Sequence, residues 1–432
     1  MRVISSQNKP SHRSGWLSIA IPVLLGLFFT LQVSAAGHSS IADPRLQEFE
    51  DYLSENVLPN VPGAAVVVVA DGKVQLLLPY GIRKEGNSAP INADTVFRLA
   101  SVSKTFASAA TGLLVHDNQL RWDTTVSSTL RNVRFKDPDY GRQITVRNLL
   151  SQTTGLVPQA YTNLLEDNVP YRVIVSRLRE VDFICPPGTC YSYQNVAFSL
   201  TGDIIQSVTG ESYERFVRES LFQPLGMRTA TFGLKSFKET DNHATPHIWR
   251  RQQWQPVTVK NDYYNVAPAA GINASISDMQ QWLLAQLGQR PDVLPVVTLD
   301  QLQARAIRTT ASQAHYRNNK ELGEVSYGLG WRIFDYGGNR NYVHHGGWVQ
   351  GTLSEMVFNR ELQLGMVFLT NAEIRNAGEM VFRFLDIYQK PNPIEQENRL
   401  AHSGENETQP GKNYIPVRIP QAGHTAAAII NK

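Results

Sequence analysis

This 432-residue chain lacks the sequence patterns that mark several common classes of hydrolase and metalloprotein. It contains no His-Glu-x-x-His zinc motif, no Gly-x4-Gly-Lys-Ser/Thr phosphate loop and no Gly-x-Ser-x-Gly nucleophile elbow. His243 and His247 are four positions apart, but Pro246 lies between them and no acidic partner accompanies them. We therefore expect neither a metal site nor a cofactor.

The chain also has no excess of charge once its first 36 residues are set aside. Three of its 41 basic residues (Arg2, Lys9 and Arg13) and none of its 38 acidic residues lie in that segment, so the remainder is balanced. The sequence pI of about 8.7 is therefore largely a property of the N-terminus. Without a clustered basic face, we expect no nucleic-acid partner.

The N-terminal apolar run, Trp16–Leu31, is short for a membrane span. It is interrupted by Pro22 and falls below the ~20 residues that a transmembrane helix needs. Basic residues precede it, and the small residues of Val33–Ala36 follow it, which is the pattern of a secretory signal. We expect residues 1–36 to be a signal peptide and the protein to be periplasmic or secreted, without stable membrane insertion after cleavage. The alternative is an uncleaved anchor; a lipid anchor is not expected, because no cysteine lies near the cleavage site.

Cysteine is scarce, and the only two cysteines stand close together in Cys185-Pro-Pro-Gly-Thr-Cys190. In an oxidising compartment, a Pro-Pro-Gly turn can bring two such sulfurs together. The sequence predicts a disulfide here, which in so short a loop would contribute about 2 kcal/mol. Two free thiols are the alternative.

Strand patterns gather towards the two ends of the chain, and helical patterns lie between them. A helix is expected from Asp43-Pro44, and the apolar runs Ala64–Ala70 and Lys73–Leu78 flank Asp71-Gly72, a pair suited to a type I′ turn. Another helix is expected to begin near Ser101. Near the C-terminus the sequence predicts four strands and then a helix: Gly328–Tyr336, Arg340–His345, Thr352–Phe358, Leu364–Thr370 and Ala372–Tyr388. In the central part of the chain, apolar periodicity predicts helices over Ala197–Val208, Tyr213–Leu221 and Ser277–Leu287.

This arrangement predicts an α+β fold in which distant parts of the chain share one antiparallel sheet flanked by helices. The expected sheet domain comprises residues 37–114 and 321–390. A mainly helical domain, 115–320, is inserted between these parts. Residues 391–432, rich in polar residues, proline and glycine, are expected to form a poorly ordered tail.

The stretch FRLASVSKTFAS, residues 97–108, places Ser101 three positions before Lys104. On a helix these two side chains share a face. A serine becomes a nucleophile when a nearby base takes its proton, and a lysine can be that base if burial or a neighbouring charge lowers its pKa. The spacing alone also fits two surface residues, since Ser6 and Lys9 repeat it by accident.

The same stretch resembles the first motif of the serine β-lactamase and penicillin-binding-protein superfamily, and most of all the class C β-lactamases and their esterase and peptidase relatives. Further segments are similar to that family in the same order, from about residue 60 to 375. They are Ile144–Leu156, the Tyr-x-Asn motif at Tyr193–Asn195, Phe222–Met227, and His345-Gly-Gly347 in the place of the third motif.

The resemblance implies roles for individual residues. Ser101 would form an acyl-enzyme, while Lys104 and Tyr193 share proton transfer, the tyrosine being either deprotonated or strongly hydrogen-bonded. Asn195 would orient Lys104 and the substrate amide, and Gln159 would contact the substrate.

The third motif would supply the rest of the substrate site, through His345, Gly346, Gly347 and Trp348. The backbone N–H groups of Ser101 and Trp348 would hold the oxyanion. A family lysine that binds a substrate carboxylate is replaced by His345, and Gly346 removes a hydroxyl that often assists it. His344 would face the opposite side of the strand as a structural residue.

These departures favour an exported serine hydrolase of esters or amides, acting on a small molecule or a peptide such as a cell-wall fragment. Two alternatives stay open. One is a β-lactamase or D-Ala-D-Ala carboxypeptidase. The other is a ligand-binding or sensor protein that does not turn over.

Overall fold

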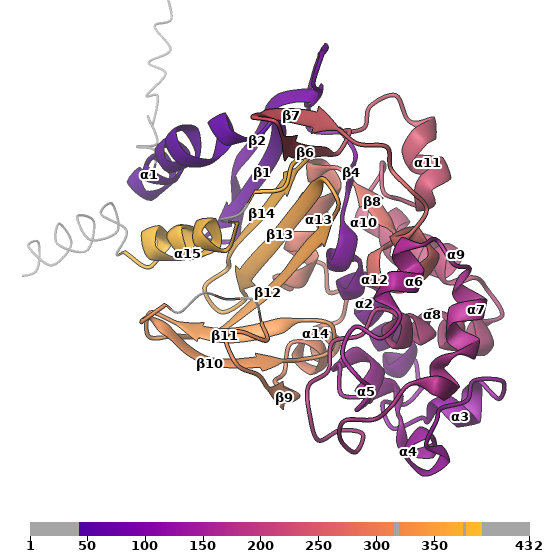
Figure 1. The fold of residues 1–432 in the computed structure, drawn as a ribbon. Coiled ribbons are helices and arrows are strands. Elements are labelled where there is room, and N and C mark those ends of the chain that lie inside the picture. Colours follow the sequence, from indigo (N-terminus) through magenta and orange to yellow (C-terminus); the bar gives the residue numbers. More distant parts are fainter. Residues whose placement is uncertain (1–42, 315, 317–318, 375–376, 391–432) are drawn as a thin grey trace, which may run out of the picture. The chain divides into compact units, whose positions relative to one another are not determined.

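The computed structural model describes residues 43–314, 316, 319–374 and 377–390 (Figure 1). The signal peptide expected at 1–36 and the tail expected at 391–432 lie outside the described residues. Among the helices that are described, none combines the length and the apolar character needed to cross a membrane.

A nine-stranded sheet runs through the described part of the chain, in the order β3-β2-β1-β14-β13-β12-β11-β10-β9. Each neighbouring pair of strands in this order is antiparallel. Strand β1 pairs with β14, so that Ala64 lies opposite Thr370 and the two ends of the chain meet in one sheet, as predicted. The strands are β1 Gly63–Ala70, β2 Lys73–Lys84, β3 Asn87–Pro90, β9 Ile307–Arg308, β10 Leu322–Tyr327, β11 Arg332–Tyr336, β12 Asn339–Val349, β13 Thr352–Asn359 and β14 Leu364–Thr370.

Strand β1 shows why this sequence forms a central strand. Its residues are buried on both faces, and side chains of successive residues alternate between two hydrophobic cores. Val67 and Val69 pack into the core on the helical side, whereas Val66 and Val68 pack into the core beneath the terminal helices. The turn to β2 uses Asp71 and Gly72, whose φ angles of 52° and 71° fit the predicted hairpin.

Two terminal helices cover one face of the sheet (Figure 1). Helix α1, Pro44–Tyr52, is capped by Asp43, and its Phe49 packs edge-on against Phe384 of helix α15, with ring centroids 5.2 Å apart. Helix α15, Ala377–Tyr388, starts later than predicted. At Ala372, where the helix was predicted to begin, the chain instead forms a β-bridge with His247.

Helices of the central part of the chain cover the other face. Helix α2, Ser103–His116, lies at their centre, and its Phe106 stacks on Trp282 of α13 at 3.9 Å. The others are α3 Val126–Thr129, α4 Pro138–Gln143, α5 Val146–Leu150, α6 Thr162–Glu166, α7 Tyr171–Ser176, α8 Val196–Thr209, α9 Tyr213–Val217, α10 Gln223–Leu225, α11 Gly233–Glu239, α12 Ala267–Ala270, α13 Ile276–Gln286 and α14 Val296–Leu302. The expected α+β fold class is confirmed.

Short strands also occur in the central part, where the sequence predicted mainly helices. Strands β4 Phe97–Arg98, β8 Ile272–Ala274 and β5 Thr231–Phe232 form a small sheet, and β6 His247–Arg250 pairs with β7 Gln253–Pro256. The described residues belong to one compact unit. The predicted division into a sheet domain and an inserted helical domain stays a prediction.

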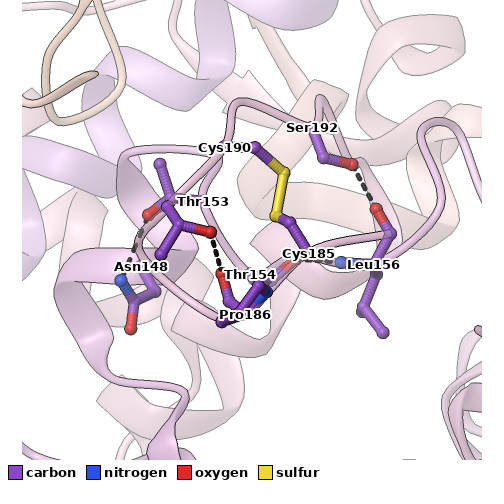
Figure 2. The surroundings of a disulfide bond; sticks show 9 residues. Asn148, Thr153, Thr154, Leu156, Cys185, Pro186, Cys190 and Ser192 are labelled. Carbon is purple, nitrogen blue, oxygen red and sulfur yellow. Dashed lines mark hydrogen bonds between the residues drawn. A yellow bond between two sulfur atoms is a disulfide. The ribbon is translucent and has the colours of Figure 1, made fainter. Parts of the chain in front are cut away.

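The predicted disulfide joins Cys185 to Cys190 (Figure 2). It closes a loop that is tied to the neighbouring segment on both sides: Gly188 N–H donates to the Thr153 carbonyl at 2.7 Å, and the Ser192 hydroxyl donates to the Leu156 carbonyl. Tyr193 follows directly. The cross-link therefore fixes the backbone that leads into the second family motif.

Replacing both cysteines by serine is expected to lower the free energy of unfolding by about 2 kcal/mol, because the unfolded chain loses a small closed loop. Urea unfolding curves of the double variant and of the wild type, with and without reductant, measure this. Reduced wild type should match the double variant, and identical midpoints for all samples would contradict the prediction.

Candidate active site

Ser101 lies in a tight 3₁₀ turn, Ala100–Val102, immediately before helix α2. Ala100 adopts a positive φ of 46°, which is uncommon for a residue with a side chain and occurs often at functional sites. Strand β12 passes directly against this turn. A Cβ atom added to Gly347 would lie 2.3 Å from the Leu99 carbonyl oxygen and 3.0 Å from the Ser101 nitrogen, so only glycine fits there.

Lys104, the second residue of helix α2, is fully buried, as its 0% exposure shows. Its Nζ lies 3.2 Å from Ser101 Oγ, 2.7 Å from Asn195 Oδ1 and 3.0 Å from the carbonyl oxygen of Ala269. It also lies 4.7 Å from the centre of the Tyr193 ring. The structure thus brings the predicted serine, lysine and Tyr-x-Asn motif to one point.

The surroundings of Lys104 favour its neutral form. Burial holds the pKa of Lys104 well below its ordinary value, and the positive charge of Arg332 lowers that pKa further. A neutral amine has two protons, which match the two acceptors Asn195 Oδ1 and Ala269 O. Its lone pair then faces Ser101 Oγ and can accept the hydroxyl proton.

Tyr193 reaches the same serine from helix α8's N-terminal side. Its hydroxyl donates to Ser101 Oγ at 2.9 Å. Burial raises the pKa of Tyr193, although the charge of Arg332 and the hydrogen bond to Ser101 oppose this shift. Of the two tyrosine states considered from the sequence, the hydrogen-bonded and protonated one is favoured, so Tyr193 is suited to donate a proton.

Gln159 and Asn195 form one wall beside the serine. The Gln159 N–H donates to the Tyr193 carbonyl at 2.9 Å, and its Oε1 accepts from Asn195 Nδ2 at 3.3 Å. Gln159 has a positive φ of 56°, which turns its side chain into this wall. Both residues line the cavity described next, where their amide groups could contact an amide substrate.

A cavity of about 520 Å³ opens above Ser101. Tyr193 and Asn195 line it on one side and Gly346, Gly347 and Trp348 of strand β12 line it on the other. Trp348 is 55% exposed. The predicted oxyanion donor Trp348 therefore lies on the strand that borders Ser101.

The two histidines of β12 differ in their relation to the cavity, and their predicted roles stay predictions. His345, predicted to contact substrate, is completely buried and does not line the cavity; its ring nitrogens pair with the Tyr327 hydroxyl at 3.1 Å and the Gly346 carbonyl at 2.8 Å. His344, predicted to be structural, does line the cavity. The lining of the cavity includes residues from both faces of β12.

Arg332, the first residue of β11, is a cavity residue that the sequence did not reveal. It is 6% exposed, and its Nε is buried without a hydrogen-bond partner among the described residues. None of the ion pairs found in that part of the chain involves it. A buried guanidinium without a counter-ion is a strong candidate to bind an anion, preferably a carboxylate. The sequence alone does not place Arg332 at the cavity; the strand pairing does, because it sets Arg332 opposite His344.

The rate at which a fluorophosphonate modifies Ser101 is expected to rise with pH through the lowered pKa of Lys104, because the neutral amine is the reactive form. The variant Arg332→Gln removes a charge that lowers this pKa. The acidic limb of the variant's pH–rate profile should therefore lie at higher pH than that of the wild type. Arg142→Gln, an exposed cation, is the matched control. An acidic limb that does not move in Arg332→Gln would contradict this electrostatic role.

Comparison with known proteins gives matches over most of the chain. The family model described as Beta-lactamase matches residues 49–383. A protein named Unguisins hydrolase ungD′ from Aspergillus campestris is 27% identical over 342 residues, covering 76% of this chain and 62% of its own. Protein flp from Staphylococcus aureus (strain NCTC 8325 / PS 47) is 27% identical over 326 residues, covering 72% and 60%. The chain thus spans about three fifths of the length of these relatives.

A solved structure shares the fold. The octameric penicillin-binding protein homologue from Pyrococcus abyssi superposes with a TM-score of 0.71 and 20% sequence identity. The match covers 81% of this chain and 78% of that one.

Proposed function

Because the chain belongs to the Beta-lactamase family, we propose that it is a serine hydrolase that cleaves an ester or amide through an acyl-serine intermediate. One observation carries the proposal: Ser101 Oγ lies within hydrogen-bond distance of both the buried Lys104 amine and the Tyr193 hydroxyl. These two groups can act as base and acid.

In the first half-reaction, Ser101 Oγ attacks the substrate carbonyl while Lys104 takes its proton. The backbone N–H groups of Ser101 and Trp348 stabilise the negative charge on the carbonyl oxygen, where one such donor is typically worth about 2.7–4 kcal/mol. Tyr193 gives its proton to the leaving nitrogen or oxygen and is reprotonated from Lys104. The bond to the leaving group breaks, and an acyl-serine remains.

In the second half-reaction, a water molecule loses a proton to the same base, and its oxygen attacks the acyl carbon. The bond to Ser101 Oγ breaks, the serine regains a proton, and the acid product leaves. Lys104 and Tyr193 return to their starting protonation states.

Arg332 supports a substrate that carries a carboxylate. The third motif lacks the family's usual groups that bind a substrate carboxylate, because histidine and glycine stand at positions 345 and 346. The buried guanidinium of Arg332 can take over that role from the neighbouring strand. Peptidoglycan-derived peptides and β-lactams both carry a carboxylate, so peptidase or β-lactamase activity stands beside esterase activity as a second candidate.

Export is part of the proposal. The pattern of a basic segment, an apolar run and small residues within positions 1–36 supports it. The disulfide between Cys185 and Cys190 also supports it, since such bonds persist chiefly in oxidising compartments.

Labelling by a fluorophosphonate or a fluorescent penicillin should be lost in Ser101→Ala and kept in the control Ser176→Ala, whose serine lies on the exposed side of α7. Gel fluorescence and intact mass measure the adduct. Equal labelling of Ser101→Ala would refute the assignment. A stoichiometric acyl adduct of Ser101 with an ester or amide substrate that water does not release would favour a sensor.

A substrate panel tests the role of Arg332. It contains short p-nitrophenyl esters, D-aminoacyl amides, D-Ala-D-Ala peptides and β-lactams. Each is measured at a pH where the rate of the variant no longer changes with pH, so that a shift of the Lys104 pKa does not affect the comparison. Arg332→Gln is expected to lower kcat/KM for substrates with a carboxylate by about tenfold or more relative to neutral esters, because it loses a charge-assisted hydrogen bond. An equal loss for charged and neutral substrates would exclude carboxylate binding.

A further inference from the structure

We propose that the part of the cavity on the far face of strand β12 from Ser101 binds a positively charged group of the substrate, and that Glu355 receives it. The inference rests on the proposed function, since it describes the substrate of the same site. It assigns that substrate two opposite charges, a carboxylate at Arg332 and an ammonium at Glu355.

The cavity continues beyond Ser101 because part of β12 has a free edge. Strand β11 pairs with β12 only as far as His344, opposite Arg332. The following residues up to Val349 pair with β13 alone among the described strands. The lining crosses this edge, from Ser101 on one face to His344 and Glu355 on the other.

Glu355 is a buried carboxylate with one oxygen engaged. Its residue is 9% exposed, and its Oε2 accepts a hydrogen bond from His344 Nε2 at 2.8 Å. His344 Nδ1 lies 2.8 Å from the hydroxyl of Tyr316. These two contacts hold the His344 ring and, through it, the Glu355 carboxylate.

The second oxygen of Glu355 is available to a ligand. Among the described residues, nothing donates a hydrogen bond to Oε1. This oxygen is also not fully covered by protein atoms, so a ligand can reach it. A buried carboxylate gains most from a donor that also brings charge, such as an ammonium.

Gly346 is the residue that lets Glu355 take this position. It pairs with Glu355 across the strands, and a Cβ atom at position 346 would lie 2.6 Å from Oε2 and 3.0 Å from Oε1. A side chain there would push the carboxylate away. The glycine that removed a hydroxyl from the third motif thus makes room for an acidic group instead.

Arg332 and Glu355 line the same cavity without forming an ion pair with one another among the described residues. Arg332 Nε and Glu355 Oε1 each lack a hydrogen-bond partner among the described residues. A ligand complementary to both is a zwitterion, and the substrate class we infer is a peptide whose terminal residue carries a free carboxylate and a side-chain amine.

Binding measured by titration calorimetry on Ser101→Ala separates this inference from the proposed reaction, because no turnover is needed. The probes are N-acetyl-alanyl dipeptides, in the all-L and all-D forms, ending in lysine, norleucine or glutamate. In the better-bound configuration, the lysine peptide should bind about tenfold or more tightly than the norleucine peptide, and the glutamate peptide more weakly than either.

Adding Glu355→Gln should bring the affinities for lysine and norleucine peptides close together, and Gly346→Ala should reduce their ratio by displacing the carboxylate. Glu361→Gln, an exposed acid in the turn after β13, should keep the ratio. If Glu355→Gln does not fold, the test rests on the ratio of the affinities for the lysine and norleucine peptides, measured in Ser101→Ala with and without Gly346→Ala. The proposal is overturned if no peptide binds, if lysine has no advantage over norleucine, or if its advantage survives in the folded variants. Failure of the proposed acyl-serine reaction would be seen separately, as equal labelling of the wild type and Ser101→Ala.

Discussion

The burial of Lys104, with no acidic partner in the part of the chain that the structure describes, is the constraint on which the site depends. An ammonium ion in this position would lack both water and a counter-charge, so the fold favours the neutral amine. The amine is then held by two acceptors, Asn195 and the Ala269 carbonyl, and its lone pair is left for Ser101. Three segments that are distant in sequence must be in place before this lysine can be buried. Its reactivity is therefore a consequence of completed packing.

Much of this could be predicted from local patterns. The hairpin at Asp71-Gly72, the all-valine interior of β1 and the pairing of the chain ends follow from side-chain periodicity and turn chemistry. Ser101, Lys104 and Tyr193 were found because they belong to motifs whose order along the chain resembles a known family. The boundaries were less secure. Strand β11 starts at Arg332 rather than Gly328, because Gly330 forms a turn with φ of 79°.

The rest of the site could not be predicted, because it depends on pairing between strands. Arg332 and Glu355 carry no motif of their own, and each reaches the cavity only through its neighbours on β12, His344 and Gly346. The place of His344 in the cavity lining could not be predicted for a related reason. Alternation along a strand predicts which residues share a face, but not that a cavity will extend round a free edge of that strand.

The pairing of β1 with β14 has a consequence for the time at which this protein becomes reactive. The strand that follows the first helix is completed only by one that lies some three hundred positions later, so the central sheet is rich in long-range contacts and is expected to form slowly. Until the ribosome has released β12 to β14, the nucleophilic turn has no opposing strand. Under the proposed mechanism, a chain still in synthesis cannot form an acyl-serine, whatever acyl donors surround it.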